Sequence, residues 1–337
     1  MPAHASDDTL AAIEYAFAQG WSDGLPVVPP TAGRVESMLG MWNCEAGEEI
    51  GRIPPRHRVI TMQQAAANAI MAGCIDEMFP VVLAAIEAVL DERFNVIGPT
   101  ASTGGAAPLV IVHGPIVEEL EFNTGAAILG AGNRANLTLG RALNLVIRNA
   151  VGSVPGDLDQ ATTGHPGRIA YCLPEGPAGD WPPLAAELSV PAGVSAVTVY
   201  AAEAPHSVAE HATEDAHQLL EAFARVARAT NYAGGVIVAV VCPEHRAVFQ
   251  AAGWSKADIR ETLFAATTVP AGDLHHTGRH GSTGAEIDLV PSVDDIWIVA
   301  GGGPAGGHSA IIPPWLGSAR GTGSRPVTAG VGVCIDC

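Results

Sequence analysis

The chain has 337 residues, of which 48% are apolar, and its formal net charge is −18. A chain of this size and composition can bury the core of one large domain or two ordinary ones without disulfides. Such an acidic surface repels phosphate backbones and anionic lipid headgroups, so neither nucleic acid nor a membrane is an expected partner.

No segment of the sequence is typical of a membrane span or a secretion signal. The longest apolar stretches, such as 234–242, have about half the length that a bilayer span needs. The first ten residues lack a basic region followed by an apolar run. We therefore expect a cytoplasmic protein, in which the six cysteines are core residues, metal ligands or redox groups.

The first part of the chain has the apolar spacing of helices. Residues 7–19 place apolar side chains at helical intervals after an acidic start. Residues 61–73 and 78–91 are rich in alanine and predict two further helices, joined near Cys74. Cys74 is expected at a helix end with part of its side chain exposed.

A rigid loop is predicted at residues 20–31. Its sequence, GWSDGLPVVPPT, has two glycines and three prolines in twelve residues, which suits neither a helix nor a central strand. Asp23 lies in this loop and is a candidate catalytic acid or base, with a structural turn role as the alternative.

Small hydroxyl and glycine residues then lead into a short buried strand at 109–114, whose His113 is a candidate catalytic residue. A long helix is predicted at 132–152, entered through glycine and asparagine. Arg134 at its start opposes the helix dipole and favours an anionic partner, either a substrate carboxylate or an internal acid. The candidate substrate-binding residues of this region are Thr103, Asn133, Arg134 and Asn136.

Residues 153–192 are rich in proline and glycine, show little periodicity and predict a boundary or a long connection. Beyond them, buried strands and helices alternate. The predicted elements are a strand at 196–203, a helix at 211–228 capped by Thr213, a strand at 235–242, a helix at 255–268 capped by Ser255, and a strand at 294–303.

Alternating helices and buried strands favour an α/β fold. Each half offers a helix, a buried strand near a histidine (His113 or His245) and a second helix, which a duplicated α/β unit would explain. The expected organisation is an N-terminal α/β half at 1–152, the connection at 153–192, a C-terminal α/β half at 193–316, and a glycine-rich tail at 317–337.

The sequence Cys-Ile-Asp-Cys at 334–337 carries two thiols that can close a small disulfide ring or bind a soft metal ion. Asp336 lies between them and disfavours a thiolate, so Cys334 and Cys337 need a positive neighbour, which is an arginine, a histidine or a metal. Two incidental thiols are the alternative interpretation.

A second candidate is DLHHTGRHG at 273–281, where His276 and His280 have the H-x3-H spacing of zinc sites. Together with Cys334 and Cys337 they would complete a shell for a zinc, iron or copper ion. Histidines in a solvated polar loop are the alternative.

A third candidate is the loop AGGGPAGGHSAIIP at 300–313, which follows a strand directly. Such loops bring backbone N–H groups close to a bound anion. We single out His308 as a catalytic candidate and Gly303 and Ser309 as substrate-binding candidates, with a structural turn as the alternative. The sequence has no dinucleotide fingerprint or P-loop, so no nucleotide cofactor is expected.

Four segments, at 20–31, 67–91, 129–149 and 300–313, resemble a poorly characterised family of bacterial proteins, with similarity over 20–315. Members of this family resemble partners of small proteins that bear a Sec/Cys-Gly-Ser-Cys (UGSC) motif, beside which they are encoded. The resemblance implies thiol or selenol chemistry on a small molecule and a small thiol or selenol protein as a partner. It assigns no catalytic residues, and the motif itself is absent from this chain.

These observations support three hypotheses. The first is a thiol-dependent oxidoreductase, in which Cys334 and Cys337 cycle between dithiol and disulfide beside a pocket formed by 300–313 and 97–136. The second is a metal-dependent lyase or hydratase with cysteine and histidine ligands. The third is a non-catalytic partner subunit of another enzyme. We expect an enzyme that acts on a small, anionic substrate and forms a homo-oligomer.

Overall fold

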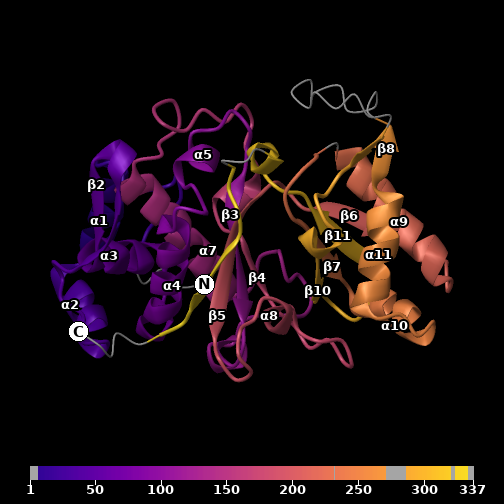
Figure 1. Cartoon of the computed structure of the whole chain (residues 1–337). Helices are drawn as coiled ribbons and strands as arrows, with labels where there is room; N and C mark the ends of the chain where they lie inside the picture. The colour runs from indigo at the N-terminus through magenta and orange to yellow at the C-terminus, as the bar shows by residue number, and fades with distance from the viewer. Residues whose placement is uncertain (1–6, 231, 271–285, 320–322, 333–337) are drawn as a thin grey trace.

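Two central β-sheets lie between two outer groups of helices in the computed structural model, which describes residues 7–230, 232–270, 286–319 and 323–332 (Figure 1). The predicted α/β class is confirmed. None of the helices in these ranges combines the length and apolarity that crossing a bilayer requires.

The predicted helices and strands of the first part are present, with bounds shifted by a few residues. The long helix predicted at 132–152 is α7 followed by a π-helical turn, η3 (Ile147–Val151). The elements are α1 (Asp7–Ala18), α2 (Ala32–Met41), β1 (Glu49–Ile53), β2 (Arg58–Thr61), α3 (Met62–Ala72), α4 (Phe79–Leu90), α5 (Ile97–Thr100), β3 (Ala107–His113), α6 (Ile116–Glu119), α7 (Arg134–Val146), β4 (Cys172–Pro174), α8 (Leu184–Glu187) and β5 (Ala196–Ala202).

The second part begins with a short strand that follows β5 closely. Its helix α10, which starts with a proline in its first turn, has no counterpart among the predicted elements. The elements are β6 (His206–Ala209), α9 (Ala216–Thr230), β7 (Ile237–Val241), α10 (Pro243–Ala251), α11 (Lys256–Ala266), β8 (Thr268–Pro270), β9 (Glu286–Asp288), β10 (Ile296–Ala300), β11 (His308–Ile312) and β12 (Val327–Gly330).

One of the two predicted helix caps is confirmed. Ser255 accepts from the N–H of Asp258, whose side chain accepts in return from the N–H of Ser255, so α11 begins with a complete capping box. The prediction for Thr213 is wrong, because Asp215 accepts from the N–H groups of His217 and Gln218 at the start of α9.

The strands bury side chains on both faces, which explains why the sequence shows apolar runs without alternation. In β3, Val110 and Val112 pack towards the helices, whereas Leu109 and Ile111 pack towards the other sheet. The residues of β7 divide in the same way between α9–α11 and the inter-sheet core. Tyr200 of β5 meets Trp297 of β10 between the sheets, with ring centroids 6.3 Å apart.

The two sheets share one pattern of strand pairing. In the first sheet, β3 runs parallel to β4 and antiparallel to β5, which pairs antiparallel with β12. In the second sheet, β7 runs parallel to β10 and antiparallel to β11, which pairs antiparallel with β6. We call residues 79–202 the first unit and residues 216–312 the second unit. These two units share a sheet topology, but their bounds differ from the halves expected at 1–152 and 193–316, because β4 and β5 both pair with β3.

The units meet in a symmetric contact at the far ends of β5 and β11. Ala202 and Pro314 form an antiparallel bridge, flanked by hydrogen bonds from the N–H of Glu203 to the Pro313 carbonyl and from the N–H of Trp315 to the Ala201 carbonyl. Beyond this bridge the edge strands change sides. β6 follows β5 but joins the sheet of the second unit, while β12 follows β11 but joins the sheet of the first.

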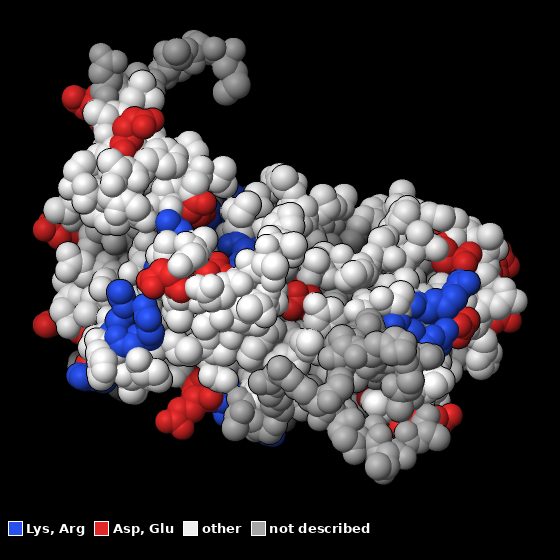
Figure 2. Space-filling model, turned by 90° about the horizontal axis from the view of Figure 1, so that it is seen from above, with Lys and Arg blue, Asp and Glu red and all other residues white. Residues whose placement is uncertain are grey.

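Charged side chains are distributed in small groups over the face seen from above. Figure 2 shows Lys and Arg groups with acidic side chains beside them, separated by wide uncharged areas. This distribution fits the composition, in which 15% of residues are charged. The described part of this face therefore presents no broad basic surface of the kind that binds nucleic acid.

Candidate functional site

A cluster of polar side chains lies at the carboxyl end of β7. Cys242 follows this strand directly, and the loop 301–307 follows the neighbouring parallel strand β10. Glu210 follows β6, and Ser309 lies at the start of β11. Because β11 runs antiparallel to β6 and β7, all these residues meet at one edge of the second sheet.

Cys242 is the residue that caps α10, which begins at Pro243. The unpaired N–H groups and the dipole at this end of a helix favour a negative charge, so the position suits a thiolate. Proline is preorganised for the first helical turn, which explains why the chain turns directly from strand into helix here.

His245 lies one turn along α10 and is held at both ring nitrogens. Its Nε2 is 2.8 Å from the backbone carbonyl oxygen of Glu210. A carbonyl only accepts, so Nε2 carries the proton and Nδ1 is the basic nitrogen of the neutral ring. Nδ1 is 2.7 Å from the Ser309 hydroxyl, which also accepts from the Cys242 N–H at 3.0 Å. The basic nitrogen of the imidazole thus faces the Ser309 hydroxyl, while the Cys242 thiol donates to the Gly306 carbonyl at 3.8 Å.

The electrostatics of this cluster favour ionisation of the thiol. Burial opposes a thiolate at Cys242, but hydrogen bonds from the His245 side chain, the Ser309 hydroxyl and the His245 N–H outweigh it, and they lower the pKa to about 7. For His245, burial opposes the charged ring, but interaction with Cys242 and the Glu210 carbonyl raises its pKa. A thiolate and an imidazolium therefore stabilise each other.

The loop 301–307 contributes the close approach that this geometry needs. A Cβ atom on Gly307 would lie 1.9 Å from the Glu210 carbonyl oxygen and 2.8 Å from His245 Nε2. Glycine at this position therefore lets the Glu210 carbonyl reach the imidazole. The N–H of Gly306 donates to a Glu244 carboxylate oxygen at 2.9 Å, which ties the loop to the first turn of α10.

The structure brings two of the predicted residues of this loop into or beside the cluster. Ser309 is buried within it, while His308 is exposed and forms an edge contact with the His211 ring, with centroids 4.6 Å apart. The Nδ1 atom of His211 accepts from the Gly307 N–H at 3.2 Å. Gly303 lies against Ala126 of the first unit, on the side of the loop that faces the other sheet.

A cavity of about 810 Å³ lies in the first unit, and all the residues that line it fall between 114 and 194. Thr124 and Gly176 line it, and both bond to residues at the end of β10. The Thr124 carbonyl accepts from the Gly302 N–H at 2.9 Å, and the Gly176 N–H donates to the Ala300 carbonyl at 3.0 Å. Gly302 in turn approaches Cys242, since a Cβ atom on Gly302 would lie 3.7 Å from that of Cys242. Cys242, His245 and Ser309 do not line this cavity themselves, so the loop 301–307 separates it from the thiol.

His113, the other catalytic candidate, occupies the corresponding strand end in the first unit. The N–H of Glu175 donates to the Val112 carbonyl, just as the N–H of Gly301 donates to the Val241 carbonyl, so His113 corresponds to Cys242. His113 is fully buried, with Nδ1 2.9 Å from a Glu175 carboxylate oxygen and Nε2 2.9 Å from the Thr198 hydroxyl.

The network around His113 is closed by further bonds. Burial opposes ionisation of Glu175, but hydrogen bonds from His113 and from the N–H groups of Leu184 and Ala185 outweigh it and keep its pKa below the ordinary value. Thr198 bonds onward to the Thr328 hydroxyl at 2.8 Å, which joins β5 to β12. The arrangement suits a structural anchor, because each polar group already has a partner within the fold.

The remaining candidates of the first unit make contacts that organise loops. Asp23 forms a bidentate ion pair with Arg141, at 2.8 Å for both bonds. Asn133 caps α7 by accepting from the N–H of Asn136, and the Asn136 amide donates to the Asn123 and Ile128 carbonyls.

Arg134 and Thr103 complete this set. Arg134 Nε donates to the Gly73 carbonyl at 2.9 Å. The partner of this nitrogen is therefore an uncharged backbone group at the end of α3 and not an anion. The Thr103 carbonyl accepts from both the N–H and the hydroxyl of Thr162. These contacts leave the residues apart from the Cys242 cluster.

The predicted metal-binding and redox residues Cys334, Cys337, His276 and His280 lie outside the described residues. Within the described ranges, no group of three or more His, Cys, Asp or Glu side chains is arranged to hold a metal ion. Their roles stay predictions.

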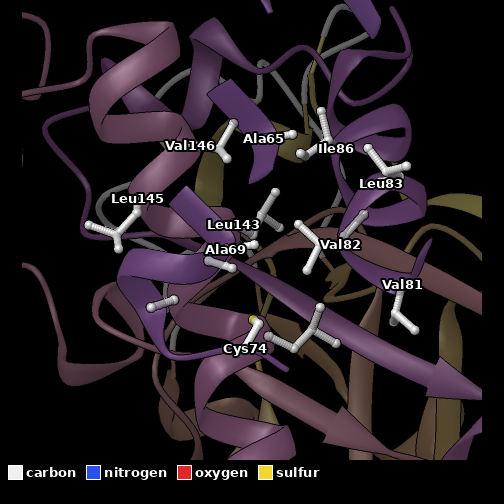
Figure 3. Packing of buried hydrophobic residues seen from close by; sticks show 14 of the residues in the cluster. Ala65, Ala69, Cys74, Val81, Val82, Leu83, Ile86, Leu143, Leu145 and Val146 are labelled. Carbon is white, nitrogen blue, oxygen red and sulfur yellow. The ribbon is translucent and has the colours of Figure 1, made fainter. Parts of the chain in front are cut away.

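The other described cysteines differ from Cys242 in their surroundings. Figure 3 shows Cys74 packed near Ala69 and Leu143 in the helical core, and its side chain is buried rather than partly exposed as predicted. Burial raises the pKa of Cys74 to about 12, because the opposing effect of its hydrogen bond with Thr138 is smaller. Burial also raises the pKa of Cys172, and Cys44 is buried too. These three are apolar fillers.

Sequence alone suggests that Cys242 is a further filler, because it ends an apolar run. The signal that identifies it is the sequence Cys-Pro-Glu-His at 242–245. A proline after a buried strand predicts a helix start, and a histidine three residues after a capping cysteine lies in the first turn beside it.

In comparisons with known proteins, no family model, no curated protein and no solved structure matches the chain.

Proposed function

We propose that this protein is a thiol-dependent enzyme in which Cys242 attacks an electrophilic carbon of a small substrate and His245 transfers protons. The observation that carries the proposal is the Cys242–Ser309–His245–Glu210 cluster, in which both ring nitrogens of the histidine are held by hydrogen bonds at a helix start. A nucleophile, a base and a group that orients the base are the parts that covalent catalysis by cysteine needs.

The proposed step conserves atoms and charge. The Cys242 proton passes to His245 Nδ1, with the Ser309 hydroxyl within hydrogen-bond distance of that nitrogen. The thiolate sulfur then forms a bond to an acyl carbon of the substrate. The bond to the leaving group breaks, and the leaving group takes its electron pair and the proton from His245. Water attacks the resulting thioester with His245 as general base, which releases the acid and restores the thiol.

Ser309 is the competing nucleophile, because its hydroxyl oxygen lies 2.7 Å from the basic nitrogen of His245. Cysteine is favoured for two reasons. A thiol ionises far more readily than a serine hydroxyl, and Cys242 caps the helix whose dipole stabilises its anion. The Ser309 hydroxyl then bridges the His245 imidazole and the Cys242 N–H and keeps their relative positions fixed.

The proposal keeps the thiol chemistry predicted from sequence and gives the reactive role in the described residues to Cys242. Redox cycling of Cys334 and Cys337, a bound metal ion, and assembly with a small thiol protein remain predictions about other parts of the chain. We also propose that the protein works in the cytoplasm, where thiols stay reduced.

A chromogenic acyl donor tests the proposal directly. The full chain is mixed with p-nitrophenyl acetate, the release of nitrophenolate is followed in a stopped-flow instrument, and acetylated peptides are located by mass spectrometry. We expect a burst of one nitrophenolate per chain with the acetyl group on Cys242. Cys242→Ala should lose the burst, while Cys74→Ala, which removes a buried thiol, should keep it.

Three outcomes would overturn the assignment. An unchanged burst in Cys242→Ala would show that another group reacts. Acetylation of Ser309, with the burst lost in Ser309→Ala, would make the protein a serine-dependent enzyme. The absence of any burst at pH values above the Cys242 pKa would show that the thiolate is not nucleophilic towards acyl carbon.

A further inference from the structure

A second cavity lies in the helical layer of the first half, remote in sequence from Cys242. Its volume is about 710 Å³, within the range of about 300–1,000 Å³ that is typical of small-molecule sites. Its wall is built from the loop 20–31, from α2 and α3, from the start of β2, and from the π-helical turn η3.

The loop 20–31 forms a fixed wall of this cavity. The ion pair between Asp23 and Arg141 anchors the loop to α7, and Arg141 also donates to the Pro26 carbonyl at 3.0 Å. The N–H of Val28 donates to the Met71 carbonyl at 3.2 Å, which fastens the loop to α3. A cavity whose wall is held in this way loses little conformational entropy when a ligand binds.

The turn η3 supplies polar groups to the opposite side. π-Helical turns are rare and are frequent at functional sites, since the extra residue redirects side chains. The Asn149 amide donates to the Trp21 carbonyl at 3.0 Å and to Asn68 Oδ1 at 2.7 Å. Asn68 is only 4% exposed, although it lines the cavity among alanines of α3. The Asn68 amide also donates to the Gln64 carbonyl at 2.8 Å, so these hydrogen bonds fix the two asparagines in place at the cavity wall.

Two arginines that line the cavity have weak partners. Arg58 Nη1 donates to the Ala150 carbonyl and Arg148 Nε donates to the Gly20 carbonyl, each at 3.4 Å. Within the described ranges, neither guanidinium has a carboxylate at ion-pair distance, although this chain has twice as many acidic as basic residues. Guanidinium groups facing a cavity suit a bound anion.

The same cavity has an apolar side and a limited positive charge. Val35, Leu39 and Met71 line it beside the polar groups. Two acids, Glu36 and Asp157, line it as well. The balance of two arginines and two acids disfavours a polyanion such as a nucleotide and suits a ligand with a single negative charge and an apolar chain.

We propose that this cavity binds a small amphipathic monocarboxylate, with its carboxylate at Arg58 and Arg148 and its hydrocarbon chain against Val35, Leu39 and Met71. The site is separate from the Cys242 cluster and does not depend on the function proposed there. Trp21 lines the cavity and is 39% exposed, so a bound ligand should change its fluorescence.

Calorimetric titration of the full chain with hexanoate, hexanamide and hexyl phosphate tests the proposal. We expect hexanoate to bind more tightly than both of the others. Arg58→Gln and Arg148→Gln should each weaken hexanoate about tenfold, because each removes one charge-assisted hydrogen bond. Arg93→Gln is the matched control, since Arg93 pairs with Asp91 at the surface and does not line the cavity. Trp21→Phe should remove the fluorescence change that hexanoate causes.

Four results of these titrations would overturn the proposal. Equal affinity for hexanamide would exclude recognition of a negative charge, and tighter binding of hexyl phosphate would exclude a carboxylate. No measurable binding of hexanoate, or an equal loss in Arg93→Gln, would show that the cavity is not the site.

Discussion

The carboxyl ends of β3 and β7 occupy corresponding places in two sheets of the same pairing pattern, yet they carry different chemistry. At β3, His113 is enclosed between Glu175 and Thr198 and has no exposed surface. At β7, Cys242 caps a helix beside His245 and Ser309, under a loop of glycines. One strand end is a structural anchor and the other has the parts of a reactive site.

The difference arises from the segment that the chain enters after each strand. After His113 the chain turns through Gly114 into the short helix α6. A Cβ atom on Gly114 would lie 2.3 Å from the Val194 carbonyl oxygen, so this turn is packed closely against the segment that precedes β5. After Cys242 the chain enters α10 directly. The helix α10 has nine residues, so its dipole places a partial positive charge at the end of β7. The helix α6 has only four residues, so its dipole at the end of β3 is weaker.

We expect the largest difference between the two strand ends when His113 is replaced and the stability of the protein is measured. His113→Leu removes the partner of a buried carboxylate and of a buried hydroxyl, so we expect the free energy of unfolding to fall by about 3 kcal/mol. The Cys242 burst should remain in the folded fraction. Chemical denaturation measures the first quantity and the acyl-donor assay the second. A loss of less than about 1 kcal/mol would contradict the anchor role.

A change at His245 should alter reactivity. In His245→Gln the hydrogen bonds that favour the thiolate are weakened, so the pKa of Cys242 should rise from about 7 towards the ordinary thiol value. The thiolate fraction at neutral pH then falls by up to about 15-fold. The ultraviolet absorbance of the thiolate, taken as the difference from Cys242→Ala, measures this titration without requiring access by a reagent. An unchanged titration midpoint would contradict the pairing.

A smaller effect on reactivity is expected at Gly307. In Gly307→Ala the new methyl group collides with the Glu210 carbonyl, so the loop must shift and His245 loses its fixed orientation. We expect the burst rate to fall about tenfold, the cost of misplacing one hydrogen-bonded group. Gly33→Ala is the control, because nothing lies within 4 Å of the added methyl group. Equal rates in the two variants would show that the Glu210 contact is dispensable.

The smallest effect concerns pH. Hydrogen bonds hold the pKa of Glu175 below its ordinary value against the opposing effect of burial, so its contribution to stability is complete above the unfolded pKa of about 4.3 and is lost as the pH falls through the folded pKa. Glu175→Gln should therefore flatten the acid limb of the stability profile by about 1 kcal/mol. Parallel acid limbs for the variant and the parent protein would argue against this linkage.

Much of the fold can be predicted from local sequence, but the site depends on distant segments. Long apolar runs predict β3, β5 and β7, and the serine–aspartate pair at 255 and 258 predicts the start of α11. The role of Cys242 could not be predicted in this way, because Glu210 and Ser309 are brought to it by the pairing of β6 and β11 with β7. His113 and His245 look alike in sequence, since each lies close to a buried strand, and only their partners distinguish them.

The crossing at Ala202 and Pro314 has a consequence for folding as a whole. Each sheet is completed by an edge strand that the chain delivers from the other unit, so a fragment ending near residue 203 would lack β12, and the remainder would keep β6 only if the cut preceded it. The remainder from residue 204 keeps all four strands of the second sheet, but its β12 lacks the partner strand β5. The packing of Tyr200 on Trp297 is lost from both fragments. Because the edge strands are exchanged between the two units, we expect the units to unfold together in one cooperative thermal transition.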